Sequence, residues 1–245
     1  MATVPDQAPN GRSAGEGPPR RVGPPGRPWS GGGREELASA VRRLMELTVT
    51  SAPAAGVLAE ATARIDAVSD SLEFAVPDDS EPVPRFDGPD GAIDDGTSLV
   101  DSMPFDMVVG PCNPLAPPID LWFDPPVARG RAVFTPTYEG APGWVHGAAL
   151  AAAFDIILTA ANGRADAAGP TVELTIRYRR PTLIGVESLF ESQVTDVAER
   201  RTHSRGVLRQ NGKVTVEAVG VFVNIDSDRV AALHRMRTRH ESSEG

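Results

Sequence analysis

The chain has 245 residues, of which 33 are acidic and 24 are lysine or arginine, so its formal net charge is −9. That charge argues against a general affinity for nucleic acid or for an anionic membrane surface, and the length suits one main core with appended segments. The single cysteine, Cys112, excludes an internal disulfide and fits the reducing cytoplasm, where we interpret it as a small packed residue.

Residues 1–33 form a tail that is rich in Gly, Pro and Arg. This tail lacks the apolar stretch of a secretory signal, and its composition predicts disorder. We expect no membrane span, because the longest apolar run, residues 147–161, is too short to cross a bilayer and carries Asp155 in its middle. The protein is therefore expected to be soluble.

Residues 34–75 predict a hairpin of two amphipathic helices. Apolar residues recur at helical spacing within residues 34–48 and 56–72, at Leu37, Val41, Leu44 and Leu47 and then at Leu58, Ala61, Ile65, Val68 and Leu72. The two apolar stripes need a partner, which could be the other helix, the later domain or a second subunit. The sequence does not choose among these three.

Residues 76–112 are rich in Pro, Asp and Gly and show little periodicity, so we expect a long connector there. A linker and a lid over an active site would have the same composition. After it, residues 113–228 form the main domain, and residues 229–245 form a polar tail with room for a helix at its start.

The main domain begins with two short strands, at residues 119–123 and 130–135, each bounded by Pro or Gly. A turn-rich segment then leads into a helix of mostly small residues, 148–161, which Asn162 and Gly163 are expected to end. Four strands follow, at residues 171–178, 187–197, 203–209 and 213–224, and the dipeptide Asn211-Gly212 predicts a tight hairpin between the last two.

The strand at residues 171–178 predicts a half-buried sheet, because its apolar residues alternate with polar ones. Val172, Leu174, Ile176 and Tyr178 share one face, and Thr171 lies on the other. One helix cannot cover both faces of a sheet. We therefore expect the α+β class, with an antiparallel sheet wrapped around one long central helix and a helical extension at the N-terminus.

Asp155 is the most informative residue of this domain, because an acid inside an apolar helix is costly. A solvated helix face would explain it, but the residues three and four positions away offer no polar stripe: Ala151, Ala152, Leu158 and Thr159. The pattern therefore favours a functional role for Asp155. His146, at the helix start, is by itself better explained as a cap.

Asp155 and His146 are nine positions apart, which in a helix is a rise of about 13.5 Å and places their side chains on opposite sides. Backbone amides near Gly147 lie at the positive end of the same helix, where an oxyanion would be stabilised. A site that uses both Asp155 and these amides must draw them from two copies of the chain. A dimer with two antiparallel central helices would supply that arrangement twice.

The domain also carries a set of motif residues that runs from a turn to a strand end, namely Glu139-Gly-Ala-Pro-Gly-Trp-Val-His146-Gly147, Asp155, Thr171 and Arg177-Tyr-Arg-Arg-Pro181. Over residues 113–226 the chain resembles the hotdog-fold thioesterases of the PaaI and THEM4-like group. The resemblance implies a homodimer or dimer of dimers. It also implies hydrolysis of acyl-coenzyme A (acyl-CoA) without a metal or a redox cofactor.

The resemblance assigns roles by position. Asp155 matches the acid that acts as nucleophile or as general base, and Gly147 matches the glycine whose amide polarises the thioester carbonyl. His146 matches the histidine beside that carbonyl, and Thr171 matches the threonine that positions water or the acid. Where most members read His-Gly-Gly, this chain has Ala148, a methyl group that could tighten the acyl channel or lower activity.

Three arginines near the end of the strand at residues 171–178 are candidates for binding the phosphates of CoA: Arg177, Arg179 and Arg180. Solvation, or pairing with neighbouring carboxylates, would explain them equally well. Asn113, just before the first strand, is a weaker candidate that could reach the site.

Two other functions fit the same residues. A hotdog dehydratase or hydratase also uses a histidine with an acid, although its spacing differs from the one found here. A non-catalytic protein that binds acyl-CoA or an acyl carrier would fit Ala148 and the long N-terminal extension. The acyl length is left open, since the alanine-rich helix permits a roomy channel without requiring one.

Overall fold

The computed structural model describes residues 33–74, 100, 103–117, 119–165, 167, 169–198 and 200–223. The predicted tail before Gly33, residue 75 of the hairpin, residues 76–99 of the connector and the polar tail at 229–245 lie outside the described residues. Within the described part of the chain, no helix is both long enough and apolar enough to span a membrane.

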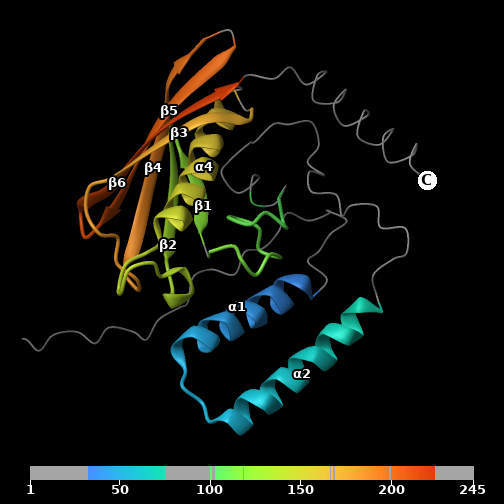
Figure 1. Ribbon diagram of the computed structural model, residues 1–245. Coiled ribbons are helices and arrows are strands. Elements are labelled where there is room, and N and C mark those ends of the chain that lie inside the picture. The colour runs from blue at the N-terminus through green and yellow to red at the C-terminus, as the bar shows by residue number, and fades with distance from the viewer. Residues whose placement is uncertain are drawn as a thin grey trace, which may run out of the picture. The chain divides into compact units, whose positions relative to one another are not determined.

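The elements follow the expected order of two helices, two strands, one helix and four strands. They are α1 (Arg34–Thr50), α2 (Ala55–Glu73), β1 (Asp120–Asp124), β2 (Val127–Val133), the 3₁₀ turn η1 (Pro136–Tyr138), α4 (Gly147–Arg164), β3 (Thr171–Tyr178), β4 (Glu187–Val197), β5 (Arg201–Gln210) and β6 (Lys213–Val223). The strands form one antiparallel sheet in the order β1-β2-β4-β5-β6-β3. Helix α4 lies along one face of this sheet (Figure 1), which confirms the α+β class.

The core lies between α4 and the sheet. Phe154, Ile157 and Leu158 of the helix are fully buried, together with Phe190, Leu208 and Phe222 of the strands. The sheet has glycines where the helix comes closest. A Cβ at Gly130 would lie 2.7 Å from the Ile157 side chain, and a Cβ at Gly206 would lie 3.1 Å from the Phe154 ring. These glycines allow the helix to pack directly on the strand backbones.

The hairpin between β5 and β6 is confirmed. Asn211 and Gly212 have φ values of 49° and 74°, and the flanking residues Gln210 and Lys213 pair across the turn. Two successive positive φ angles are characteristic of the type I′ turn, whose twist matches that of the strands it joins.

The predicted end of the central helix is wrong, because α4 continues through Asn162 and Gly163 to Arg164. Asn162 is fully buried, and its side-chain oxygen accepts a hydrogen bond from the hydroxyl of Ser204 on β5. This tertiary contact holds the residue within the helix against its local preference for a turn. The first two strands are also shifted, since Gly130 lies in the middle of β2 and not at its start.

The predicted faces of β3 are partly wrong. Val172 is 53% exposed, whereas Leu174 and Ile176 are half-buried as expected, and Tyr178, although 54% exposed, lies on the helix side and bonds to Gly147 of α4. The register with β6 shifts between Thr171 and Glu173, and such a bulge moves the residues before it to the other face. Thr171 therefore faces α4 and not the solvent, where simple alternation had placed it.

The last part of the predicted connector belongs to the core. Met103, Val108, Val109 and Cys112 are buried, and the carboxylate of Asp106 accepts hydrogen bonds from two backbone amides of the same segment. Burial also raises the pKa of the Cys112 thiol. Residues 103–117 therefore pack against the main domain, which a composition rich in Pro, Asp and Gly did not indicate.

Helices α1 and α2 differ in their contacts. The guanidinium of Arg42 on α1 donates to the carbonyl oxygen of Asn113 at 2.9 Å, and Ala38 on the same helix is buried. Helix α2 buries no residue, and its apolar side chains, among them Leu58 and Val68, are about half exposed at 53% and 52%. Among the described residues, only α1 therefore uses part of its surface to pack against the main domain.

Candidate active site

The N-terminus of α4 has one available amide. The imidazole Nδ1 of His146 accepts a hydrogen bond of 3.0 Å from the amide of Ala148, and the His146 carbonyl accepts from the amides of Ala149 and Leu150. His146 is therefore the helix cap, as its sequence context favoured. Within the described part of the chain, the N–H of Gly147 has no protein acceptor. An N–H at this end of a helix attracts an anionic oxygen.

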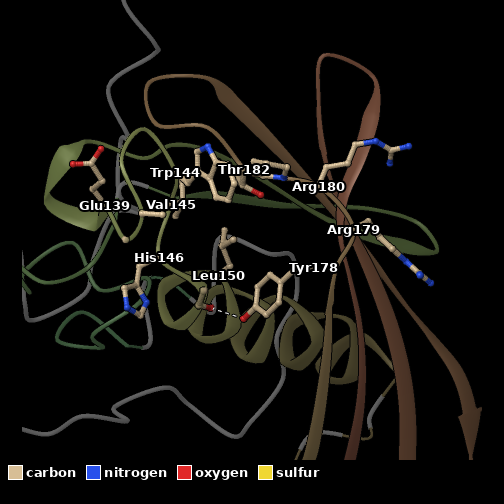
Figure 2. A pocket seen from close by; sticks show the side chains of 13 residues that line it. Glu139, Trp144, Val145, His146, Leu150, Tyr178, Arg179, Arg180 and Thr182 are labelled. Carbon is tan, nitrogen blue, oxygen red and sulfur yellow. Dashed lines mark hydrogen bonds between the residues drawn. The ribbon is translucent and has the colours of Figure 1, made fainter.

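A pocket of about 630 Å³ opens at this end of the helix. Its walls include Gly147 and Leu150 of α4, Trp144 of the preceding turn, and Tyr178 at the end of β3. Figure 2 shows the side chains of Trp144, Leu150 and Tyr178 around this space, with His146 at its edge. The lining is largely apolar, and it also includes polar side chains of both charge signs, namely Glu139, His146, Arg179, Arg180 and Thr182.

Tyr178 contacts Gly147 directly. Its hydroxyl donates a hydrogen bond of 2.8 Å to the carbonyl oxygen of Gly147, drawn in Figure 2 as a dashed line. A Cβ at position 147 would lie 2.9 Å from that hydroxyl oxygen, closer than real Cβ atoms come to other atoms. An alanine at the position with the available amide would therefore displace the end of the Tyr178 side chain.

Asp155 lies farther along α4 and has one partner of its own. Its Oδ1 accepts a hydrogen bond of 2.5 Å from the hydroxyl of Thr171, and both residues are half-buried. Asp155 does not line the pocket. It lies eight positions after Gly147 on the helix, a rise of about 12 Å. The structure thus brings Asp155 and Thr171 together, and keeps both apart from Gly147 of the same chain.

The three candidate arginines have different surroundings. Arg179 donates to the Glu217 carboxylate at 3.0 and 2.7 Å, which lowers the pKa of Glu217, and Arg180 donates to the Val214 carbonyl at 2.7 Å. Both line the pocket, whereas Arg177 does not. Arg177 is exposed on β3, opposite Glu217 in the register with β6. The structure therefore brings two of the three candidate arginines to this pocket.

Asn113 and Ala148 do not line the pocket. The side chain of Asn113 donates to the Phe105 carbonyl and accepts from the Leu115 amide, each at 2.9 Å, so it shapes its own loop. Ala148 is exposed. In a single chain, therefore, the methyl group of Ala148 does not narrow this pocket.

Sequence reasoning missed Tyr178 and Trp144 as residues of the candidate site. Tyr178 was interpreted as part of a buried strand face, and its position between Arg177 and Arg179 in the motif was the available signal. Among the described residues, no group of three or more His, Cys, Asp or Glu side chains is arranged to hold a metal ion.

Comparisons with a family model and with solved structures found similar proteins. Residues 142–217 match the family model of the thioesterase superfamily. A thioesterase superfamily protein of known crystal structure is 28% identical, with a TM-score of 0.68 over 80% of this chain and 93% of that one. Zebrafish thioesterase superfamily member 2 is 20% identical, with a TM-score of 0.42 over 44% of this chain and 81% of that one. Escherichia coli PaaI, from the phenylacetic acid degradation operon, is 20% identical, with a TM-score of 0.41 over 44% and 80%. No curated protein sequence matches the chain.

Proposed function

Because the chain carries a hotdog domain of the thioesterase superfamily, we propose that it hydrolyses an acyl-CoA thioester to the free acid and CoA at a site shared between two copies of the chain. One observation carries the proposal. Gly147, whose N–H has no protein acceptor among the described residues, lines the pocket, while Asp155 of the same chain does not. Under this proposal each chain contributes both halves of a hydrolytic site, and a second copy brings them together.

In the proposed reaction, the thioester carbonyl oxygen accepts a hydrogen bond from the Gly147 amide, and the positive end of α4 stabilises the negative charge that develops there. Asp155 of a second copy approaches from the opposite side. Its carboxylate either takes a proton from the attacking water or attacks the carbonyl carbon itself, with water then releasing the acid. The bond to sulfur breaks, and the CoA thiolate takes up a proton.

Thr171 supports this role of Asp155. Its hydroxyl donates to Oδ1, which fixes the rotation of the carboxylate and leaves Oδ2 for the reaction. A carboxylate that is half-buried and held by a short hydrogen bond is better oriented than one exposed on a helix surface.

A homodimer is supported by the position of β3. In the sheet formed by the described strands, β3 lies at one edge, and the side chain of Val172 at its start is exposed. A long edge strand offers unpaired backbone groups to a second copy. Association across a two-fold axis would set two copies of α4 antiparallel, so that each Gly147 could face the other copy's Asp155.

The arginines support CoA as the thiol part of the substrate. Arg179 and Arg180 lie on the same pocket as Gly147, and guanidinium groups bind phosphates bidentately. In a chain with a net charge of −9, such a local pair would attract a polyanionic ligand to one place. We also propose a cytoplasmic location, which the single cysteine led us to expect.

The first test measures thiol release from acyl-CoAs that range from acetyl to palmitoyl and include phenylacetyl. Release of free thiol from at least one of them supports the proposal, and the preferred acyl group identifies the substrate class. A change in enoyl-CoA absorbance without thiol release would instead indicate a hydratase. Binding of acyl-CoA without either reaction would indicate a non-catalytic binding protein.

Subunit complementation tests the shared site. Asp155→Asn and Gly147→Pro are each expected to inactivate the homodimer, the second because proline lacks the N–H and is tolerated at the first position of a helix. In a heterodimer of the two variants, isolated with two different tags, one site carries both substitutions and the other carries neither. It should recover about half of the wild-type rate. If each chain held a complete site, the heterodimer would recover none.

A further inference from the structure

Tyr178 joins the end of β3 to the first turn of α4. Its hydroxyl donates to the Gly147 carbonyl at 2.8 Å across 31 positions of sequence, and its ring lies in the pocket wall (Figure 2). The contact is tight, since even a methyl group at position 147 would meet the hydroxyl oxygen. Tyr178 therefore holds the residue whose amide the proposed function uses.

Gly147 has no side chain to limit its own backbone angles, and the hydrogen bond from Tyr178 adds to those within the helix. The peptide group before it is held by the His146 carbonyl, which accepts from the amides of Ala149 and Leu150. The peptide group after it is held at both ends. Its carbonyl accepts from Tyr178, and its N–H, that of Ala148, donates to the His146 imidazole. The direction of the Gly147 N–H is thereby set from both sides.

We propose that Tyr178 is a positioning residue of the thioester site, which holds the backbone of Gly147 so that its amide points into the pocket before the substrate binds. This inference rests on the proposed function. Donors that are already oriented stabilise a developing oxyanion without having to reorganise during the reaction. The hydroxyl bonds to the protein and not to the substrate, so its loss should slow the chemical step more than it weakens binding.

The test replaces Tyr178 by Phe, which keeps the ring and removes the hydroxyl. We expect kcat to fall about 10-fold while KM changes by less than about twofold. The chain offers a matched control in its other tyrosine. The hydroxyl of Tyr138 also donates to a backbone carbonyl, that of Leu115 at 3.0 Å, but Tyr138 does not line the pocket. Tyr138→Phe should keep the wild-type kcat.

A second measurement does not depend on activity. The amide signal of Gly147 in a ¹H–¹⁵N spectrum should shift in Tyr178→Phe and stay in place in Tyr138→Phe. The positioning role is wrong if Tyr178→Phe retains the wild-type kcat, or if its Gly147 signal is unchanged. It is also wrong if both tyrosine variants lose kcat equally, since a general loss of packing would explain that result. If the wild-type protein releases no thiol, the proposed function is contradicted instead. The Gly147 amide signal then still tests the contact between Tyr178 and Gly147.

Discussion

The two ends of the candidate site on α4 are built in different ways. At Gly147 a capping histidine, a pocket and a tyrosine from β3 surround one available amide, all within a single chain. At Asp155 a single threonine holds the carboxylate, and the pocket does not extend to it. Under the proposed function, the first end receives the thioester carbonyl and the second supplies the reactive carboxylate.

The difference between the two ends explains why the proposed site needs two chains. A helix separates residues along its axis by a fixed rise, so no side-chain movement can bring Asp155 to the amide of its own Gly147. The apolar helix nevertheless retains a half-buried acid, which is costly unless the acid is used. In the proposed dimer, a second copy supplies the missing half to each end.

Removing the carboxylate should have the largest effect. Asp155→Asn keeps the shape and the contact with Thr171 but cannot take a proton or attack, so we expect kcat to fall about 10³-fold with KM little changed. Thiol release from the preferred acyl-CoA measures this. Asp66→Asn, on the exposed surface of α2, is the control and should retain full activity. A wild-type rate for Asp155→Asn would show that the Asp155 carboxylate does not take part in the reaction.

Thr171→Val should have an intermediate effect. It removes the hydrogen bond to Oδ1 while keeping the side-chain shape, and the loss of one bond to a charged group predicts a fall in kcat of about 10-fold. Thr175→Val on the same strand is the matched control, because the Thr175 hydroxyl is exposed and makes only a 3.4 Å contact with Glu173. Equal kcat values for the two variants would mean that Thr171 does not orient Asp155.

Glu217→Gln, which changes the partner of Arg179 at the pocket beside Gly147, should have the smallest effect on the kinetics. The variant removes the ionic partner of Arg179 and frees its guanidinium for CoA phosphates, so we expect KM for acyl-CoA to fall by about twofold. Arg179→Ala should instead raise KM. A higher KM in Glu217→Gln would show that the pair orients Arg179 rather than competing for it.

The pKa of Glu217 determines the pH range over which the KM values of the wild type and of Glu217→Gln can be compared. Hydrogen bonds from Arg179 hold the pKa of Glu217 below its usual value of 4.5. The ion pair is therefore intact above pH 4.5 and is lost only as the pH falls through the lower value in the folded protein. The ratio of KM between the wild type and Glu217→Gln should consequently be constant above this pH.

Several features of the fold and site could be predicted because they depend on neighbours in the sequence. The hairpin at Asn211 and Gly212, the helix that begins at Gly147 and the separation of Asp155 from that glycine all follow from local backbone geometry. The pairing of Asp155 with Thr171 was expected through the family resemblance and not from spacing. It depends on a bulge in β3 that the alternation of residues did not reveal.

Other features were decided by contacts between distant parts of the chain. Asn162 stays helical because Ser204 holds its side chain, and Tyr178 reaches Gly147 because β3 ends beside the first turn of α4. By itself the sequence determined the elements, the acid within the apolar helix and the amide at its start, since these depend on backbone preferences over a few residues. The tertiary structure decided which strand lies at the sheet edge and which side chains meet across it, because these depend on pairings whose free energy is shared by the whole fold.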